Sequence, residues 1–97
     1  MAKNIRWTNR ALIDRTNIYK FWLEHNQSNT YPEKLEELFE KSAYIISIFP
    51  QIGTPTNYRE VLAKNVGDYK IFYRVKADEI QTLRVWDTRQ NPDNIGI

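Results

Sequence analysis

Apolar residues between Thr8 and Asn26 recur at the spacings of an amphipathic helix. Thr8 has the side chain of an N-cap residue, and the polar residues 27–29 are expected to form a loop after the helix ends near His25 and Asn26. The apolar positions lie three, four or seven residues apart and form one stripe: Ala11, Leu12, Ile18, Tyr19, Trp22 and Leu23.

A second helix is predicted from Thr30 to Phe49. Thr30 and Glu33 have the spacing of a capping box, and Pro32 is tolerated in a first helical turn. Pro50 stops the helix because proline lacks the amide hydrogen that a helix interior needs. Two helices joined by so short a loop are expected to lie antiparallel. The apolar stripe of the second helix is expected at Leu35, Leu38, Ser42, Ile45 and Phe49.

The stretches 68–75 and 80–85 alternate as strands do, and residues 76–79 between them are short and polar enough to close a hairpin. Alternation gives each strand two faces. The apolar face is predicted to carry Tyr69, Ile71, Tyr73, Val75, Leu83 and Val85. The opposite face is predicted to carry Lys70, Phe72, Arg74, Thr82, Arg84 and Trp86.

Two further segments complete the predicted sheet. Residues 4–7 alternate and suit an edge strand, and residues 58–64, centred on 59–62, are predicted to form another strand after an irregular connector at 49–56. The order β-α-α-β-β-β predicts a two-layer α+β fold over a single domain, residues 1–97. An antiparallel helical hairpin packs on one face of a small, mainly antiparallel sheet. The core is expected to bury Ile71, Tyr73, Val75, Leu83 and Val85 against Ile18, Trp22, Leu38, Ile45 and Phe49.

This arrangement leaves the opposite sheet face open, because no remaining segment is expected to cover it. Lys70, Arg74 and Arg84 would then point outward together, beside Phe72 and Trp86. Three cations and two aromatic side chains on one face suit the binding of a nucleic acid or of a partner protein. The alternative is a solvated face with exposed pairs to Glu60 or Asp87, each stabilising by about 1 kcal/mol or less.

Composition narrows the class of protein but does not choose the function. Ninety-seven residues suit one small globular domain, and a net charge of +2 is too small to indicate a nucleic-acid partner by itself. With no cysteine and one histidine, the sequence offers no thiol chemistry, and we expect no metal and no cofactor. No apolar run reaches the length of a membrane span, and no signal peptide is evident, so we expect a cytoplasmic protein.

Four pieces of the chain, in order, resemble the RelE/ParE superfamily of toxins from bacterial type II toxin–antitoxin modules. They span nearly the whole chain and look like the opening strand and helix start, the Pro-x-x-Gly turn after the helical hairpin, the central strands, and an Arg-bearing tail after the last strand. In this sequence they are Ile5-Arg6-Trp7-Thr8, Phe49-Pro50-Gln51-Ile52-Gly53, Arg59–Leu62 with Gly67–Val75, and Val85–Pro92.

The resemblance implies two alternative mechanisms. RelE-like members cut mRNA on the ribosome without a metal, using cations that stabilise the charge on the attacked phosphate. By position, Arg59, Lys70 and Arg89 match the cations of that branch and would be catalytic here. No proton donor is visible, because the chain has no Tyr after Tyr73 and its single His lies on the first helix.

ParE-like members share the fold but act by binding DNA gyrase. The Pro-x-x-Gly turn and the Arg59-Glu60 strand start resemble this branch more closely, so a growth-inhibiting, gyrase-directed toxin of the plasmid-stabilisation type is favoured. A degenerate, non-toxic member is a third alternative. In either toxin branch the resemblance implies a cognate antitoxin as a partner. The residues expected to contact the target or the antitoxin are Lys70, Phe72, Arg74, Arg84, Trp86 and Arg89.

Overall fold

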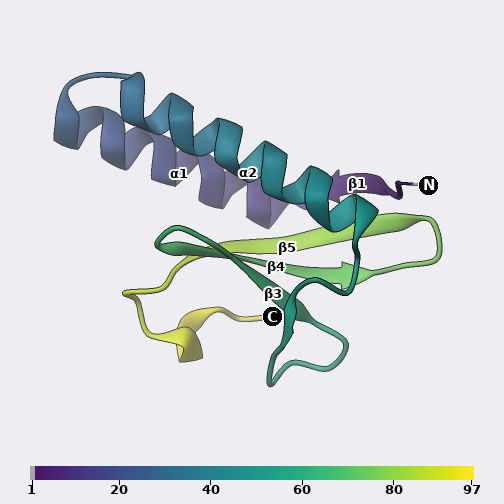
Figure 1. Cartoon of the computed structure of the whole chain (residues 1–97). Coiled ribbons are helices and arrows are strands. Elements are labelled where there is room, and N and C mark those ends of the chain that lie inside the picture. Colours follow the sequence, from purple (N-terminus) through teal and green to yellow (C-terminus); the bar gives the residue numbers. More distant parts are fainter. Residues whose placement is uncertain (1) are drawn as a thin grey trace.

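A computed structural model describes residues 2–97 and shows two antiparallel helices covering one face of a five-stranded sheet. The strand order across the sheet is β1-β5-β4-β3-β2, in which β1 runs parallel to β5 and the other neighbours are antiparallel. The predicted α+β class, the helical hairpin and the mainly antiparallel sheet are confirmed. Figure 1 also shows the C-terminal segment on the side of the sheet opposite the helices.

The helix boundaries follow the capping signals in the sequence, with one difference. In α1 (Asn9–Asn26), the hydroxyl of Thr8 accepts a hydrogen bond from the amide of Ala11, as predicted for an N-cap. In α2 (Thr30–Ile48), the N-cap is Asn29 rather than Thr30, and Glu33 binds the Asn29 side-chain amide instead of closing a capping box. Of residues 2–97, no helix combines the length and the apolar character needed to cross a lipid bilayer.

The strands are β1 (Asn4–Trp7), β2 (Thr54–Pro55), β3 (Leu62–Val66), β4 (Tyr69–Val75) and β5 (Glu79–Asp87). The edge strand at 4–7 and the central hairpin are confirmed. The strand predicted at 58–64 is wrong in its first half, because residues 58–60 form a turn and β3 begins only at Leu62. Glu60 has φ = 60°, in the left-handed region that an extended strand does not use.

The core between the helices and the sheet confirms the predicted strand residues more than the predicted helix residues. Ile71, Tyr73 and Val85 are buried, and Val75, Ile18 and Trp22 pack against them partly exposed. The other three predictions for the helix layer are wrong: Leu38 and Ile45 of α2 are 41% and 38% exposed, and Phe49, which follows α2, is 62% exposed. Leu35 and Ser42 of the predicted stripe are buried, and the face of α2 that meets the sheet also carries Phe39 and Ile46, which were not predicted.

A β-bulge in β5 changes which side chains face the helices. Phe72 pairs with Arg84 and Tyr73 pairs with Thr82, so Leu83 has no partner opposite it in β4. Thr82 is therefore buried on the helix side, and Leu83 packs with the cluster on the other side of the sheet. The predictions for both residues are wrong, because simple alternation does not continue through a bulge.

The second face of the sheet, opposite the helices, is covered by the C-terminal segment, residues 88–97. This segment contains one turn of 3₁₀ helix, Pro92–Asn94, and then buries the side chain of Ile95 on the sheet. A second apolar cluster forms there, consisting of Val61, Ala63, Phe72, Trp86 and Ile95. The prediction that no segment covers this face is wrong.

Tyr73 joins the sheet to the connector that follows α2. Its ring is fully buried, and its hydroxyl accepts a hydrogen bond from the amide of Gly53 (2.9 Å) and donates one to the carbonyl of Pro50 (2.8 Å). A Cβ atom at position 53 would lie 2.5 Å from that hydroxyl oxygen, so the turn needs glycine there. The Pro-x-x-Gly sequence is thus a turn built around one tyrosine hydroxyl.

We predict that Tyr73→Ala lowers the free energy of unfolding by about 3–5 kcal/mol, because it removes a large buried ring. Tyr73→Phe keeps the ring but leaves two backbone groups unpaired, and we expect a loss of about 1–3 kcal/mol. Urea denaturation followed by circular dichroism measures both. A loss below 1 kcal/mol for the alanine variant would contradict the assigned position of Tyr73 in the core.

Candidate functional site

The aromatic residues predicted for the second face lie there but are not open to solvent. Phe72 and Trp86 are buried beneath the C-terminal segment. The indole Nε1 of Trp86 donates to the carbonyl of Gln90 at 3.4 Å, so the segment holds the indole edge as well as its face. The C-terminal segment therefore restricts the access of a ligand to these two rings.

Arg84 also lies on the second face, where it forms an ion pair rather than a free cationic site. Its guanidinium Nε and Nη2 donate to the carboxylate of Asp14 in α1 at 2.7 and 3.0 Å, and its Nη1 donates to the carbonyl of Ile95. The two side chains are 12% and 13% exposed. The hydrogen bond to Asp14 raises the pKa of Arg84, so this cation is committed to the fold.

Lys70 is the predicted site residue that lies beside open space on the second face. It lines two cavities, of about 510 and 130 Å³, which also share Phe72, Pro92 and Ile95. Its ammonium group forms no hydrogen bond or ion pair with any residue that the structure describes. Lys70 is therefore available to an anionic group of a ligand.

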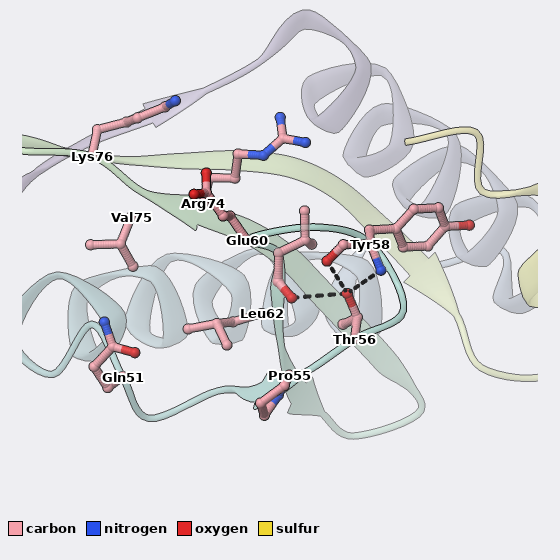
Figure 2. A pocket seen from close by; sticks show the side chains of 10 residues that line it. Gln51, Pro55, Thr56, Tyr58, Glu60, Leu62, Arg74, Val75 and Lys76 are labelled. Carbon is pink, nitrogen blue, oxygen red and sulfur yellow. Dashed lines mark hydrogen bonds between the residues drawn. The ribbon is translucent and has the colours of Figure 1, made fainter.

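Arg74 lines a separate cavity of about 390 Å³, shown in Figure 2. The floor of this cavity is the turn before β3, where the hydroxyl of Thr56 donates to the carbonyl of Val61 at 2.8 Å and accepts from the amide of Tyr58. Arg74 and Lys76 stand on the β4 side of the same cavity. Arg59 is an exposed residue of the turn itself.

Arg89 follows β5 and pairs with Asp87. Its Nε and Nη2 donate to the two carboxylate oxygens of Asp87, each at 2.9 Å, and its backbone amide adds a third bond. The Arg89 hydrogen bonds lower the pKa of Asp87, and the carboxylate in turn raises the pKa of Arg89. Asp87 is therefore ionised near neutral pH and holds no proton to donate.

The three cations proposed for catalysis are not brought together. Arg59 precedes the Leu62 end of β3, whereas Lys70 pairs with Asn65 towards the other end of that strand. Asp87 pairs with Tyr69, whose ring lies in the helix-side core, so Arg89 binds on the helix side while Lys70 faces the opposite side. Their role in cleavage remains a prediction.

One cavity that sequence reasoning missed is a groove of about 840 Å³ beside α1 and α2. We call it the α1–α2 groove. Leu12, Tyr19 and Leu23 line it from α1, and Leu12 is 44% exposed. The signal is present in the sequence: the apolar stripe of α1 is wide enough to serve two surfaces, but only Ile18 and Trp22 are predicted to enter the core, and no second surface is predicted for the rest of the stripe. The complete lining is Trp7, Leu12, Arg15, Thr16, Tyr19, Lys20, Leu23, Glu36 and Glu40.

Arg15 organises the charges of this groove. Its guanidinium pairs with Glu36 at 2.6 Å and Glu40 at 2.7 Å, and its central carbon lies 4.3 Å from the centroid of the Trp7 ring. Burial opposes the charge of Arg15, but the hydrogen bonds to the two glutamates outweigh burial and raise its pKa. The groove thus has an apolar α1 wall and an acidic α2 wall.

Comparisons with known proteins agree with the fold. The chain is similar to the solved structure of a chromosomal ParDE system from P. aeruginosa, at 22% identity and a TM-score of 0.64, over 89% of this chain and 96% of that one. It is similar to the toxin–antitoxin complex RelBE2 from Mycobacterium tuberculosis, at 20% identity and a TM-score of 0.67, over 90% and 99% of the two chains. A search of curated proteins returned no match.

The family follows from the sequence itself. A family model described as the ParE toxin of the type II toxin–antitoxin system parDE matches residues 5–92. That match runs from β1 to the 3₁₀ turn after β5, and so includes every strand and both helices. The chain therefore belongs to the ParE toxin family of type II toxin–antitoxin systems.

Proposed function

We propose that this toxin inhibits growth by binding DNA gyrase and that a cognate antitoxin neutralises it. The observation that supports binding over RNA cleavage is the separation of Arg59, Lys70 and Arg89 across two faces and two ends of the sheet. Phosphate cleavage needs its charged groups preorganised around one reacting phosphate. Cations scattered over the surface suit contact with a protein–DNA complex instead.

The surroundings of Asp87 support the same choice. Cleavage by a ribose hydroxyl needs a group that protonates the leaving oxygen near neutral pH. Asp87 is the carboxyl beside Arg89 at the end of β5, and the hydrogen bonds from Arg89 hold its pKa below the usual value. A carboxyl that is already ionised near neutral pH cannot act as a general acid there. The Asp87–Arg89 pair therefore serves structure or contact.

The α1–α2 groove is the surface that suits the antitoxin. A groove with exposed leucine and tyrosine side chains fits the apolar face of an amphipathic helix. Lys20 on one rim and Glu36 and Glu40 on the other favour a helix with acidic residues towards α1 and basic residues towards α2. The earlier expectation, that the antitoxin covers an open cationic sheet face, applies only where the C-terminal segment leaves that face.

We predict that the purified protein inhibits DNA supercoiling by gyrase and leaves ribosome-bound mRNA intact. Lys70→Ala and Arg89→Ala should each weaken gyrase inhibition by about tenfold or less, because contact energy is spread over several residues. Supercoiling assays and mapping of mRNA ends measure the two activities side by side. Cleavage of mRNA by the wild type that either substitution abolishes would make the protein a ribonuclease, and absence of both activities would make it a non-toxic family member.

We predict that Leu12→Glu weakens antitoxin binding by about thirtyfold or more, as charge introduced at a central apolar contact does. The matched control is Ile13→Glu. Ile13 is the neighbouring residue of α1, is 57% exposed and does not line the groove, so it should change the affinity little. Calorimetric titration with the co-expressed antitoxin gives both affinities. Equal losses in the two variants would remove the groove as the binding site.

We predict that the carboxyl of Asp87 titrates below the usual range for aspartate and that Arg89→Gln raises its pKa towards that range. Because the pKa is lower in the folded state, the pair stabilises the protein at neutral pH, and this contribution disappears as the pH falls through that pKa. Carbon-13 NMR of the side-chain carboxyl follows the titration. A pKa near 7 would restore Asp87 as a candidate proton donor.

A further inference from the structure

The C-terminal segment lies on the second face as a short peptide lies in a binding site. The side chain of Ile95 is 1% exposed and packs in the cluster with Phe72, Trp86 and Ala63. The backbone carbonyl of Ile95 accepts hydrogen bonds from Arg84 Nη1 and from Arg10 Nη2, the latter at 3.3 Å. The next carbonyl, that of Gly96, accepts from Arg10 Nη1 at 2.7 Å. We call this place the Ile95 site.

Residues 92–97, beyond the bonds that Thr88 and Gln90 make to the sheet, have few other contacts. Residues 91–94 are exposed, and from Pro92 onward the segment pairs with no strand of the sheet. A further bond from the sheet side to residues 92–97 is a long one, 3.5 Å from the Tyr58 hydroxyl to the carbonyl of Pro92. One buried isoleucine, the half-buried Ile97 and three carbonyl bonds are a small part of the interactions that hold a domain together. The segment can therefore leave the sheet while the helix-side core stays folded.

Leaving the sheet would open a continuous groove. The cavities of about 510 and 130 Å³ are both lined by Pro92 and Ile95 and share Lys70 and Phe72, so the segment divides one depression into two. Its floor is apolar, with Phe72 and Trp86. Its polar groups are the Arg10 and Arg84 donors at the Ile95 site and the ammonium of Lys70. Asp93 of the segment lines the larger cavity together with Lys70.

We propose that the Ile95 site is a docking site for an extended segment of a partner protein and that residues 92–97 occupy it in the free toxin. The segment to be bound carries a branched aliphatic residue in place of Ile95, presents its carbonyl groups to Arg10 and Arg84, and places an acidic side chain near Lys70. Naming the cognate antitoxin as the source of that segment rests on the proposed function. The docking site itself rests on the resident peptide and on the unpaired Lys70.

The test is a titration of Ile95→Ala with the heptapeptide Asn-Pro-Asp-Asn-Ile-Gly-Ile, the sequence of residues 91–97. The substitution weakens the binding of the resident segment to the Ile95 site. The peptide should therefore bind the variant about tenfold or more tightly than it binds the wild type. Chemical shifts of the indole N–H groups report the site. Trp86 should shift, and Trp22, which donates to the Tyr69 hydroxyl on the helix side, should not.

Two controls distinguish binding at the Ile95 site from nonspecific binding of the peptide. Ile13→Ala removes the same atoms from an exposed isoleucine of α1 and should bind the peptide as weakly as the wild type does. Lys70→Glu, added to Ile95→Ala, should weaken binding by about threefold to fivefold through the reversed charge. Absence of saturable binding to Ile95→Ala, equal binding to the wild type, or equal binding of a peptide with aspartate in place of its first isoleucine overturns the proposal.

A second measurement serves if Ile95→Ala does not fold. In the wild type, the amides of Asn94 and Ile95, which donate to Asn91 and Pro92, should exchange with deuterium about a hundredfold or more faster than the amides of β4. Exchange of these amides only through global unfolding overturns the proposal. A wild-type dimer that dissociates when residues 92–97 are deleted would assign the site to exchange between two copies and would also overturn it. None of these measurements uses gyrase or ribosomes, so they stand apart from the test of the toxin's target.

Discussion

The ion pair between Asp14 and Arg84 joins the helices, the sheet and the C-terminal segment. The carboxylate of Asp14 accepts from two nitrogens of Arg84 and also from the amide of Val85, where β5 extends beyond its short neighbour β1. Arg84 then uses its remaining nitrogen on the carbonyl of Ile95. Loss of one member of so buried a pair leaves a charge without a partner, a change that costs about 3–5 kcal/mol. The pair also satisfies an exposed strand edge that would otherwise invite pairing with another chain.

The faces of the strands could be predicted from the sequence. The chemistry of the second face could not, and the Asp14–Arg84 pair shows why. Alternation along 69–75 correctly separated the residues that face the helices from Lys70, Phe72 and Arg74. It could not show that Arg84 meets a carboxylate 70 residues away, because such a contact depends on tertiary packing rather than on local period. The bulge at Leu83 had the same effect on a smaller scale: one extra residue reversed the faces assigned to Thr82 and Leu83.

The helices show a different limit of prediction. The period of 3.6 residues identified α2, but α2 is apolar over more than one face, so the period alone did not choose which face meets the sheet. Leu35, Phe39 and Ile46 pack in the core, while Leu38, Ile45 and Phe49 remain exposed. Similarly, Ala11 of α1 is buried and Leu12 lines the groove. An apolar stripe that is too wide to be buried against the sheet indicates that part of it forms a second, exposed surface. This can be recognised from the sequence by comparing the apolar area of the stripe with the area that a domain of this size can bury.

These features are the basis on which action through binding surfaces is proposed for this toxin. Arg15, Arg84 and Arg89 are each paired with a carboxylate in the fold. The apolar side chains that a small core does not accommodate are left on the helices, where a partner helix can cover them. Lys70, beside the Ile95 site, is without an ionic partner among the residues that the structure describes, and it lies where a short peptide is already bound. Three arginine side chains are thus held by carboxylates of the same chain, and exposed apolar side chains lie on the helices, which is the distribution on which the proposed binding of partners rests.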